Sequence, residues 1–306
     1  MIVCGVCRVH AIILVPSIEM NLRRDLRAGV QEAQIVLSHG CIAYRQAGVV
    51  NGERPLIFIH GWGGSSLYFR HVMAQLGALR YNAALDLPGF GNSPMPESVE
   101  ATSFYTHRGL AHVVAEWLDA IGVTQCDVVG HSFGAGVAIA LAAMQPQRVR
   151  CVVLSNFSTF RNEAERRLIM LMHEMSSLLL KLRGFRFAHS DAFARLLGAR
   201  FFYHPPSLEI LREGLEDFWR MNPDAAHWAM RYALNWETPN DLRSLRQPLL
   251  LIHSHHDQIM PPRNAVYTAS LAPRGQLYWL DECGHLPMVE KPEAFLEIVT
   301  RFLNGG

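Results

Sequence analysis

Short apolar runs alternate with longer segments of helical periodicity from about residue 33 onward. The strand-like runs are 33–37, 41–47, 56–60, 83–86, 127–131, 151–155, 249–253 and 276–280. The helical patterns fall near 66–78, 104–121, 133–144, 262–271 and 292–303. Strands that alternate with helices build a parallel sheet covered by helices, so the pattern predicts an α/β fold. The Ser-His-Gly between the first two runs predicts a hairpin.

The regular alternation stops between about Phe157 and Asp241. This segment is helical in pattern and rich in aromatic residues, and it contains no convincing strand. We therefore predict that residues 33–156 and 241–306 form an α/β core and that 157–240 form an inserted helical cap. The stretch 168–182 is apolar with three methionines. It is expected either to pack on the core or to line an acyl tunnel or touch lipid.

The first twenty residues contain a short apolar stretch without a clear basic region or cleavage site. A secretory signal is therefore not favoured, and we expect a cytoplasmic protein. Residues 1–32 are predicted to be an extension of the core, a candidate for a dispensable segment, with a working start near Met20 as one alternative. The chain has no run of eighteen uninterrupted apolar residues, so no transmembrane helix is predicted.

Composition narrows the choice of partner. Half of the 306 residues are apolar and the formal charge is +1, so no strong field would attract nucleic acid, an anionic membrane or polyanionic substrates. A small, roughly neutral molecule is the expected partner. Six cysteines are present, and those in apolar runs fit buried free thiols. Cys4 and Cys7 form a lone C-x-x-C without a second ligand pair, so no metal or other cofactor is predicted.

The strongest local motif is Gly130-His131-Ser132-Phe133-Gly134. It matches G-x-S-x-G, follows the strand-like run CDVVG and opens the helical pattern AGVAIALAAM, which is the context of a nucleophile elbow. A nucleophile in such a strained turn needs small neighbours two positions away on either side, and both are glycine. The motif predicts Ser132 as a nucleophile at a helix N-terminus, where amide groups favour developing negative charge.

A nucleophilic serine needs a base, and the base needs an acid that orients it. Asp257 ends the run PLLLIHSHHD, and His285 follows the last strand-like run. The order Ser, Asp, His is the one expected for this kind of elbow. Asp281 and Glu282 lie too close in sequence to His285 to serve as the acid, and Asp86 follows an earlier strand.

Acyl transfer also needs two donors directed at the oxyanion, usually backbone amides. One is predicted to be the N–H of Phe133. The other is predicted to be the N–H of Trp62, in the glycine-rich segment His60-Gly61-Trp62-Gly63-Gly64 that follows a strand. The Trp62 ring is expected to line the acyl pocket.

Together HGWGG from 60, DLPGFGNS from 86, GHSFGAG from 130, HSHHD ending at 257 and CGHLPMVEKPEAF from 283 resemble the α/β-hydrolase superfamily. The match covers about 33–156 and 241–304 and is similar to its carboxylesterases. The resemblance implies an eight-stranded, mostly parallel sheet with a cap inserted after the sixth strand. Dehalogenases and epoxide hydrolases of this fold carry Asp at the elbow, so Ser132 argues against those activities.

The expected function is therefore hydrolysis of a carboxylic ester or thioester of a small to medium apolar substrate through an acyl-enzyme. Carbon–carbon hydrolases of ring-fission products also resemble this chain in DLPGFGNS and in the tail after His285, and they remain an alternative. The loop HSHHD lacks the Gly and Arg that often stand there in those enzymes. A third alternative, from another class, is a ligand-binding receptor that retains the fold and turns over slowly.

Overall fold

The computed structural model describes residues 29–305 except 178, 179, 181, 183 and 261. Within this part, one eight-stranded sheet has the order β1-β2-β4-β3-β5-β6-β7-β8. Strand β2 pairs antiparallel with β1 and β4, and every other pair is parallel. The predicted mostly parallel, eight-stranded α/β fold is confirmed. The bounds are Gln31–Leu37, Gly40–Ala47, Leu56–Ile59, Asn82–Leu85, Cys126–His131, Val149–Ser155, Leu249–Ser254 and Gly275–Leu280 for β1 to β8.

The burial of each strand follows its place in the sheet. Every residue of β3, β4, β5 and β7 is buried, as expected for parallel strands covered on both faces. The edge strands β1 and β8 alternate between more and less exposed positions. The predicted hairpin joins β1 and β2 through Ser38 and His39 alone, because Gly40 already pairs with Leu37 at the start of β2.

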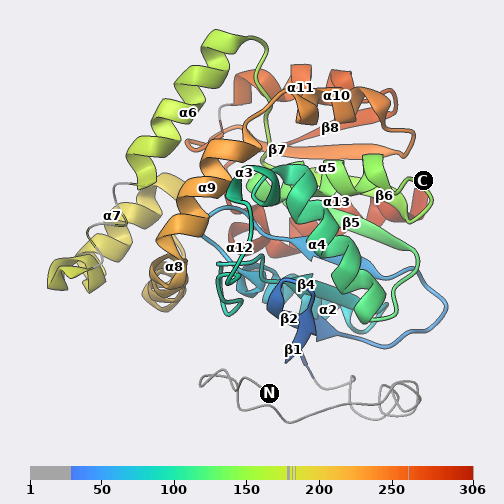
Figure 1. Cartoon of the computed structure of the whole chain (residues 1–306), viewed down its shortest axis with the longest axis horizontal. Coiled ribbons are helices and arrows are strands. Elements are labelled where there is room, and N and C mark those ends of the chain that lie inside the picture. The colour runs from blue at the N-terminus through green and yellow to red at the C-terminus, as the bar shows by residue number, and fades with distance from the viewer. Residues whose placement is uncertain (1–28, 178–179, 181, 183, 261, 306) are drawn as a thin grey trace.

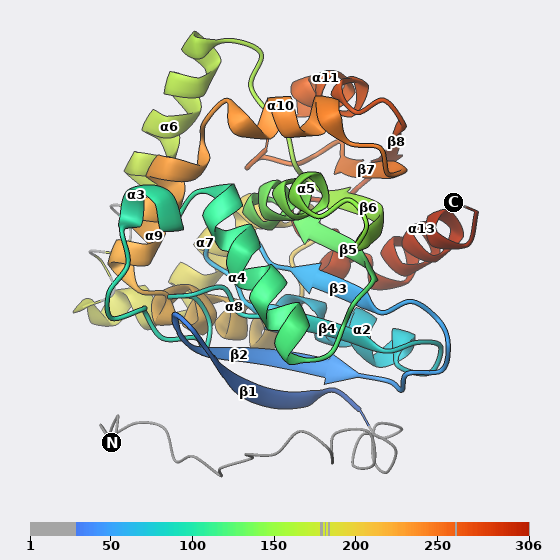
Figure 2. The ribbon, with the colours of Figure 1, turned by 45° about the vertical axis from the view of Figure 1, so that its right-hand side comes forward.

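Two helical layers cover the sheet (Figures 1 and 2). One contains α4 (His107–Ala120), α5 (Phe133–Met144), α10 (Glu237–Ser244) and α11 (Ala265–Leu271), and the other contains α2 (Arg70–Leu76) and α13 (Pro292–Gly305). The helix predicted at 104–121 is divided into α3 (Ala101–Phe104) and α4, because the Thr106 side chain accepts from the Gly109 N–H and starts a new helix. Short 3-10 turns, η1 (Ser66–Phe69) and η4 (Pro262–Asn264), precede α2 and α11.

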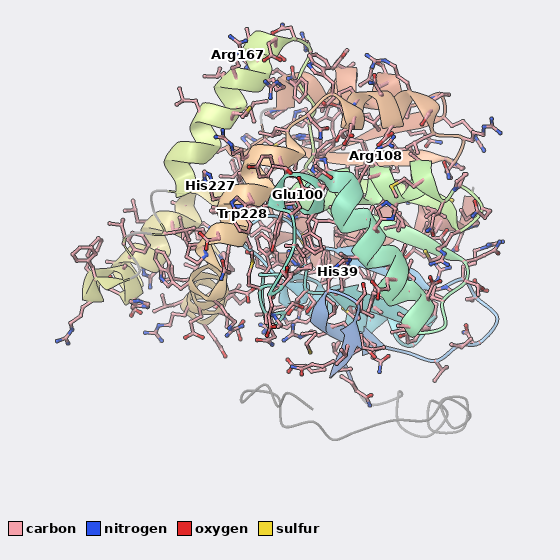
Figure 3. All side chains as sticks on the ribbon, in the orientation of Figure 1. His39, Glu100, Arg108, Arg167, His227 and Trp228 are labelled. Atoms are coloured by element: carbon pink, nitrogen blue, oxygen red, sulfur yellow. The ribbon has the colours of Figure 1, made fainter. Side chains whose placement is uncertain are left out.

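Every described element between β6 and β7 is an α-helix or a 3-10 turn. Its elements are α6 (Glu163–Ser177), η3 (Arg186–His189), α7 (Asp191–Phe201), α8 (Leu208–Arg220), α9 (Pro223–Ala233) and α10. Figure 1 shows α6 to α9 to the left of the sheet. Helix α10 packs instead on α5 and α11, and Nε of Arg108, labelled in Figure 3, lies 3.2 Å from Asp241 of α10. The division into core and cap at 157 and 240 remains a prediction.

The predicted extension 1–32 lies mostly outside the described residues, as do Cys4 and Cys7. Strand β1 begins at Gln31, two residues before the strand-like run predicted at 33–37. None of the described helices is both long and apolar enough to cross a membrane.

Candidate active site

The predicted site residues lie at one edge of the sheet. The carboxyl ends of parallel strands meet at the same edge, where ligands bind in open α/β sheets. Trp62 follows β3, Ser132 follows β5, Asp257 follows β7 and His285 follows β8. Residues that are up to 223 positions apart in sequence, from Trp62 to His285, therefore share one region.

Ser132 occupies a strained turn between β5 and α5. Its φ is 49° and its ψ is −120°, a conformation that costs a non-glycine residue about 1 to 3 kcal/mol. Its N–H donates to the Ser155 carbonyl at 2.9 Å, and its carbonyl accepts from the Ala135 N–H at 2.9 Å. These two bonds hold the turn between β6 and the first turn of α5.

The glycines two positions before and after Ser132 permit this turn. A Cβ at Gly130 would lie 2.5 Å from Cα of Ala135, and a Cβ at Gly134 would lie 2.4 Å from the His60 carbonyl oxygen. Both contacts are far inside van der Waals distance and involve backbone, which cannot move away cheaply. The small residues expected from the motif are therefore required by packing on both sides of Ser132.

Asp257 and His285 are in direct contact. Nδ1 of His285 lies 2.8 Å from Oδ2 of Asp257, and both side chains are almost completely buried. Donation from Nδ1 leaves Nε2 of His285 as the unprotonated ring nitrogen, which is the form a general base needs. No hydrogen bond joins Ser132 to His285 in the structure; that contact is often long in sites without substrate.

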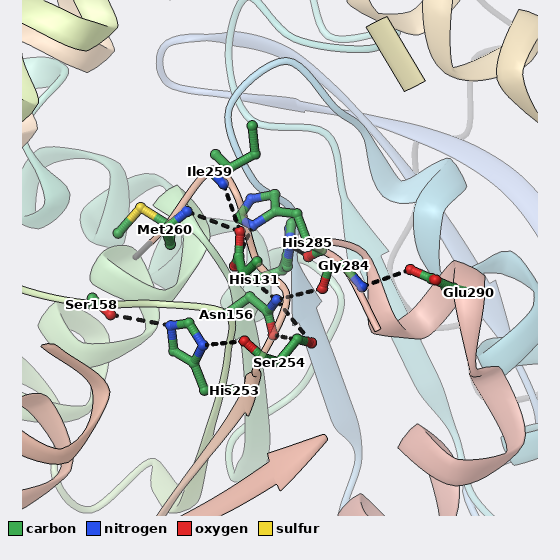
Figure 4. Close-up of polar contacts among 11 residues, drawn as sticks. His131, Asn156, Ser158, His253, Ser254, Ile259, Met260, Gly284, His285 and Glu290 are labelled. Atoms are coloured by element: carbon green, nitrogen blue, oxygen red, sulfur yellow. Dashed lines mark hydrogen bonds and ion pairs between the residues drawn. The ribbon is translucent and has the colours of Figure 1, made fainter. Parts of the chain in front are cut away.

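The carboxylate of Asp257 accepts four hydrogen bonds. Oδ1 accepts from the N–H groups of Ile259 at 2.8 Å and Met260 at 2.9 Å, and Oδ2 accepts from His285 and Asn156 (Figure 4). Burial alone would raise the pKa of Asp257, but the attraction and hydrogen bond of His285 and the Met260 N–H outweigh it and lower the pKa. The acid is therefore held in its charged form.

Asn156 is a buried residue of the site that the sequence analysis did not single out. It directly follows β6, and its Nδ2 lies 2.8 Å from Oδ2 of Asp257 and 2.8 Å from the Gly284 carbonyl oxygen. A lone asparagine after a strand has no motif that would mark it. The one feature of the sequence that could have indicated Asn156 is its position at the carboxyl end of a predicted parallel strand, at the same edge of the sheet as the other site residues.

His131, inside the G-x-S-x-G motif, supports the His285 loop. Its Nε2 lies 2.8 Å from the His285 carbonyl oxygen, so this nitrogen carries the proton and donates. Burial, with the nearby His285, lowers the pKa of His131 to about 3, and the ring is neutral at ordinary pH. The backbone of His285 is also fixed by its own N–H, which donates to the Phe201 carbonyl of α7 at 2.6 Å.

The two predicted oxyanion amides belong to segments that adjoin Ser132. Phe133 is the first residue of α5, and the backbone of Gly61 packs so closely that a Cβ there would lie 3.1 Å from Cβ of Ser132. Neither the Trp62 nor the Phe133 N–H has an acceptor among the residues described. The Trp62 ring is held from the other side, since its Nε1 donates to the Ala226 carbonyl of α9 at 2.9 Å.

The other carboxylates considered as the acid lie in different contacts. Asp86 accepts from the N–H groups of Ser66 at 2.7 Å and Asn92 at 2.8 Å, and so fixes two loops. The side chain of Asp281 is 85% exposed and lies 3.6 Å from Nε2 of His255. The structure therefore places Asp257, and neither of these two, against His285.

An apolar cavity lies next to these groups. It contains about 810 Å³ of empty space, part of it open to solvent. Its lining comes from the segment after β3, α7, α8 and the start of α12 (Pro287–Glu290), and includes Trp62, Leu197, Phe201, Leu211, Phe218 and Leu286. Ser132 and His285 are absent from its wall. The wall does include Trp62, whose N–H is a predicted oxyanion donor, and Leu286, which directly follows the predicted base His285. Arg70 and Glu213, which form an ion pair, are its charged lining residues.

Comparison with known proteins agrees with this architecture. The family described as alpha/beta hydrolase fold matches residues 54–292. The chain is 31% identical over 263 residues to 2-hydroxymuconate semialdehyde hydrolase of Pseudomonas putida, covering 81% of this chain and 86% of that one. It is 28% identical over 256 residues to pimeloyl-(acyl-carrier protein) methyl ester esterase of Neisseria meningitidis, covering 82% and 94%.

Solved structures show the same fold. A hydrolase from Pseudomonas aeruginosa superposes with a TM-score of 0.74 at 22% identity, covering 89% of this chain and 98% of that one. The enol-lactonase from Burkholderia xenovorans gives 0.72 at 19% identity, covering 89% and 100%. The chain belongs to the alpha/beta hydrolase fold family, and within it the chain is a hydrolase. Because its relatives are named for different reactions, membership alone leaves the bond it cleaves open.

Proposed function

We propose that the chain is a serine hydrolase that cleaves a carboxylic ester or thioester of a small to medium apolar substrate. Ser132 carries the proposal, since a non-glycine residue with φ of 49° at a strand-to-helix turn matches the strained geometry of a nucleophile elbow. Backbone strain of this kind is common at functional sites, and at a strand-to-helix turn it presents the serine oxygen to a substrate.

The reaction would proceed in two steps. Oγ of Ser132 attacks the carbonyl carbon while Nε2 of His285 accepts its proton, and Asp257 stabilises the resulting imidazolium. The oxyanion accepts from the Trp62 and Phe133 amides, each worth about 3 kcal/mol in the transition state. His285 then protonates the leaving oxygen or sulfur, and water hydrolyses the acyl-enzyme by the same route.

The cavity supports an apolar substrate. Its wall is formed mainly by aliphatic and aromatic side chains, and its charged lining residues Arg70 and Glu213 already neutralise each other. Pockets of this kind bind apolar groups, with orientation supplied by a few polar groups nearby. A cytoplasmic location is part of the proposal, since Cys126, Cys151 and Cys283 are buried free thiols.

Carbon–carbon hydrolysis of a ring-fission product is the second candidate. It is favoured by the 31% identity to 2-hydroxymuconate semialdehyde hydrolase, while the 28% identity to a methyl ester esterase favours ester cleavage. Both reactions would use the same Ser132 and His285, so the substrate distinguishes them.

The test is hydrolysis of p-nitrophenyl esters from acetate to palmitate, beside a vinylogous diketone ring-fission product. The wild type, Ser132→Ala and the exposed control Ser98→Ala are compared. Ester turnover that only Ser132→Ala abolishes supports the proposal. Turnover of the ring-fission product alone would favour the carbon–carbon reaction. If the wild type acts on neither, a ligand-binding receptor on this fold becomes the better account.

A further inference from the structure

We propose that Asn156 is a positioning residue for this reaction, whose side-chain amide fixes the Asp257 carboxylate and the loop that carries His285 in one geometry. The inference rests on the proposed function, because it assigns Asn156 a part in the same chemistry. Asn156 would act through its contacts with Asp257 and Gly284. The proposal requires no contact between Asn156 and the substrate.

The backbone at Asn156 is unusual. Its φ is 48°, in the left-handed region that few residues other than glycine, asparagine and aspartate adopt readily. Its N–H donates to the Ile252 carbonyl of β7 at 2.8 Å. The residue is fully buried, and its conformation turns the side chain from β6 toward the loops that follow β7 and β8.

The amide group then joins those two loops (Figure 4). Nδ2 carries two hydrogens, and its two closest acceptors, Oδ2 of Asp257 and the Gly284 carbonyl, both lie at 2.8 Å. The hydroxyl of Ser254 lies 3.2 Å from Nδ2 and 3.3 Å from Oδ1. One buried side chain therefore links the acid loop to the residue directly before His285.

Loss of this amide would leave two buried acceptors short of a donor. Among the residues that the structure describes, Oδ2 of Asp257 would retain only the donor His285, and the Gly284 carbonyl would lose the one side chain that donates to it. A buried acceptor left without a donor is destabilising, and the loops would relieve this by moving. Small displacements of a general base lower the rate by about 100-fold, so we expect the damage in kcat rather than in KM.

Replacement of Asn156 by aspartate gives a pH-dependent result. Two carboxyl groups at this distance cannot both be charged, so the pair would share one proton. That proton would supply the donor that the amide supplied in the wild type. The other titratable groups around the pair are His285, His253, His131 and Cys283, with Glu290 accepting from the Gly284 N–H. These groups are the same in the wild type and in every variant, so a pH dependence found only in Asn156→Asp comes from the new carboxyl group.

The experiment measures kcat and KM for p-nitrophenyl butyrate from about pH 5 to 9. Asn156→Gly keeps the positive φ and removes only the side chain, and we expect kcat to fall about 100-fold at every pH, with KM changed less than about twofold. Asn156→Asp should recover toward wild type at the acid end and lose activity as the shared proton leaves. Asn51→Gly, in an exposed loop, is the matched control.

A folded Asn156→Gly with unchanged kcat would overturn the proposal. So would an Asn156→Asp variant whose loss is the same at every pH, since that pattern is expected of a purely structural residue. A proton NMR signal from Nδ1–H of His285, far downfield in the wild type and lost in Asn156→Gly, tests the positioning without turnover. If the wild type shows this signal and Asn156→Gly loses it, but the wild type hydrolyses no ester, the proposed function fails while the positioning stands.

Discussion

One oxygen of Asp257 lies 2.8 Å from Nδ1 of His285, while the other accepts from the backbone of Ile259 and Met260. The carboxylate therefore cannot rotate without losing bonds, and it fixes which nitrogen of His285 carries the proton. We expect Asp257→Asn to lower kcat by about 10⁴-fold with little change in KM, because an amide would hold the ring in the wrong tautomer. Steady-state kinetics on an ester measure this. Asp281→Asn, which is exposed, should behave as wild type, and a loss below tenfold in Asp257→Asn would contradict the assignment.

The apolar cavity offers a position where volume can be added without a clash. Gly214 on α8 lines the cavity, and a Cβ there would meet no atom within 4 Å. Gly214→Leu is expected to shorten the longest p-nitrophenyl ester that is hydrolysed while leaving acetate turnover unchanged. Gly214→Ala is the control, because it raises helix propensity by a similar amount with little added volume. An unchanged chain-length profile in Gly214→Leu would place the acyl group elsewhere.

Close packing between Gly61 and Ser132 makes the segment after β3 sensitive to a single carbon. A Cβ at Gly61 would lie 2.8 Å from Nδ1 of His131 and 3.1 Å from Cβ of Ser132. Gly61→Ala should therefore displace the Trp62 amide and lower kcat by about 100-fold, the effect of losing one oxyanion donor. Gly184→Ala, where a Cβ would meet no atom of the described residues within 4 Å, provides the comparison. Equal kcat in the two variants would show that this segment does not support the oxyanion.

Asp217 on α8 predicts how stability depends on pH. Its side chain is fully buried, Oδ2 has no partner among the described residues, and burial raises the pKa of this carboxyl to about 6. Because the folded pKa lies above the unfolded value of 3.8, the contribution is complete below about pH 4 and is lost as pH rises through 6. The loss amounts to about 3 kcal/mol.

Asp217→Asn should remove that loss. Urea unfolding at about pH 4.5 and 7.5 is expected to show the variant more stable than wild type at the higher pH only. Glu216→Gln, an exposed neighbour on the same helix, should keep the wild-type dependence. If Asp217→Asn follows the wild type at both pH values, folding does not raise the pKa of Asp217 and the burial argument is wrong.

Strands were predicted well because their signal is local. Each of the eight strand-like runs became a strand with ends within two residues of the prediction, since a buried parallel strand is apolar along its whole length. The break at 105–106 between α3 and α4 was missed. There, the capping side chain of Thr106 decides the boundary within an otherwise continuous helical pattern.

The site was only partly predictable for a related reason. The pairing of Asp257 with His285 was predictable because chain order and strand ends single out both residues, and the structure brings them into contact. Asn156 was missed, since its partners Ser254 and Gly284 lie 98 and 128 residues away and no local pattern encodes such contacts. The cavity wall likewise combines segments whose packing the sequence does not specify.

The most direct test of the central claim is labelling with a fluorophosphonate, followed by peptide mass spectrometry. If Ser132 is the activated nucleophile, the wild type takes one label, the label maps to the peptide containing Ser132, and Ser132→Ala and His285→Ala take none. Labelling of Ser132→Ala at the wild-type rate, or a folded wild type that takes no label, would contradict the serine-hydrolase account.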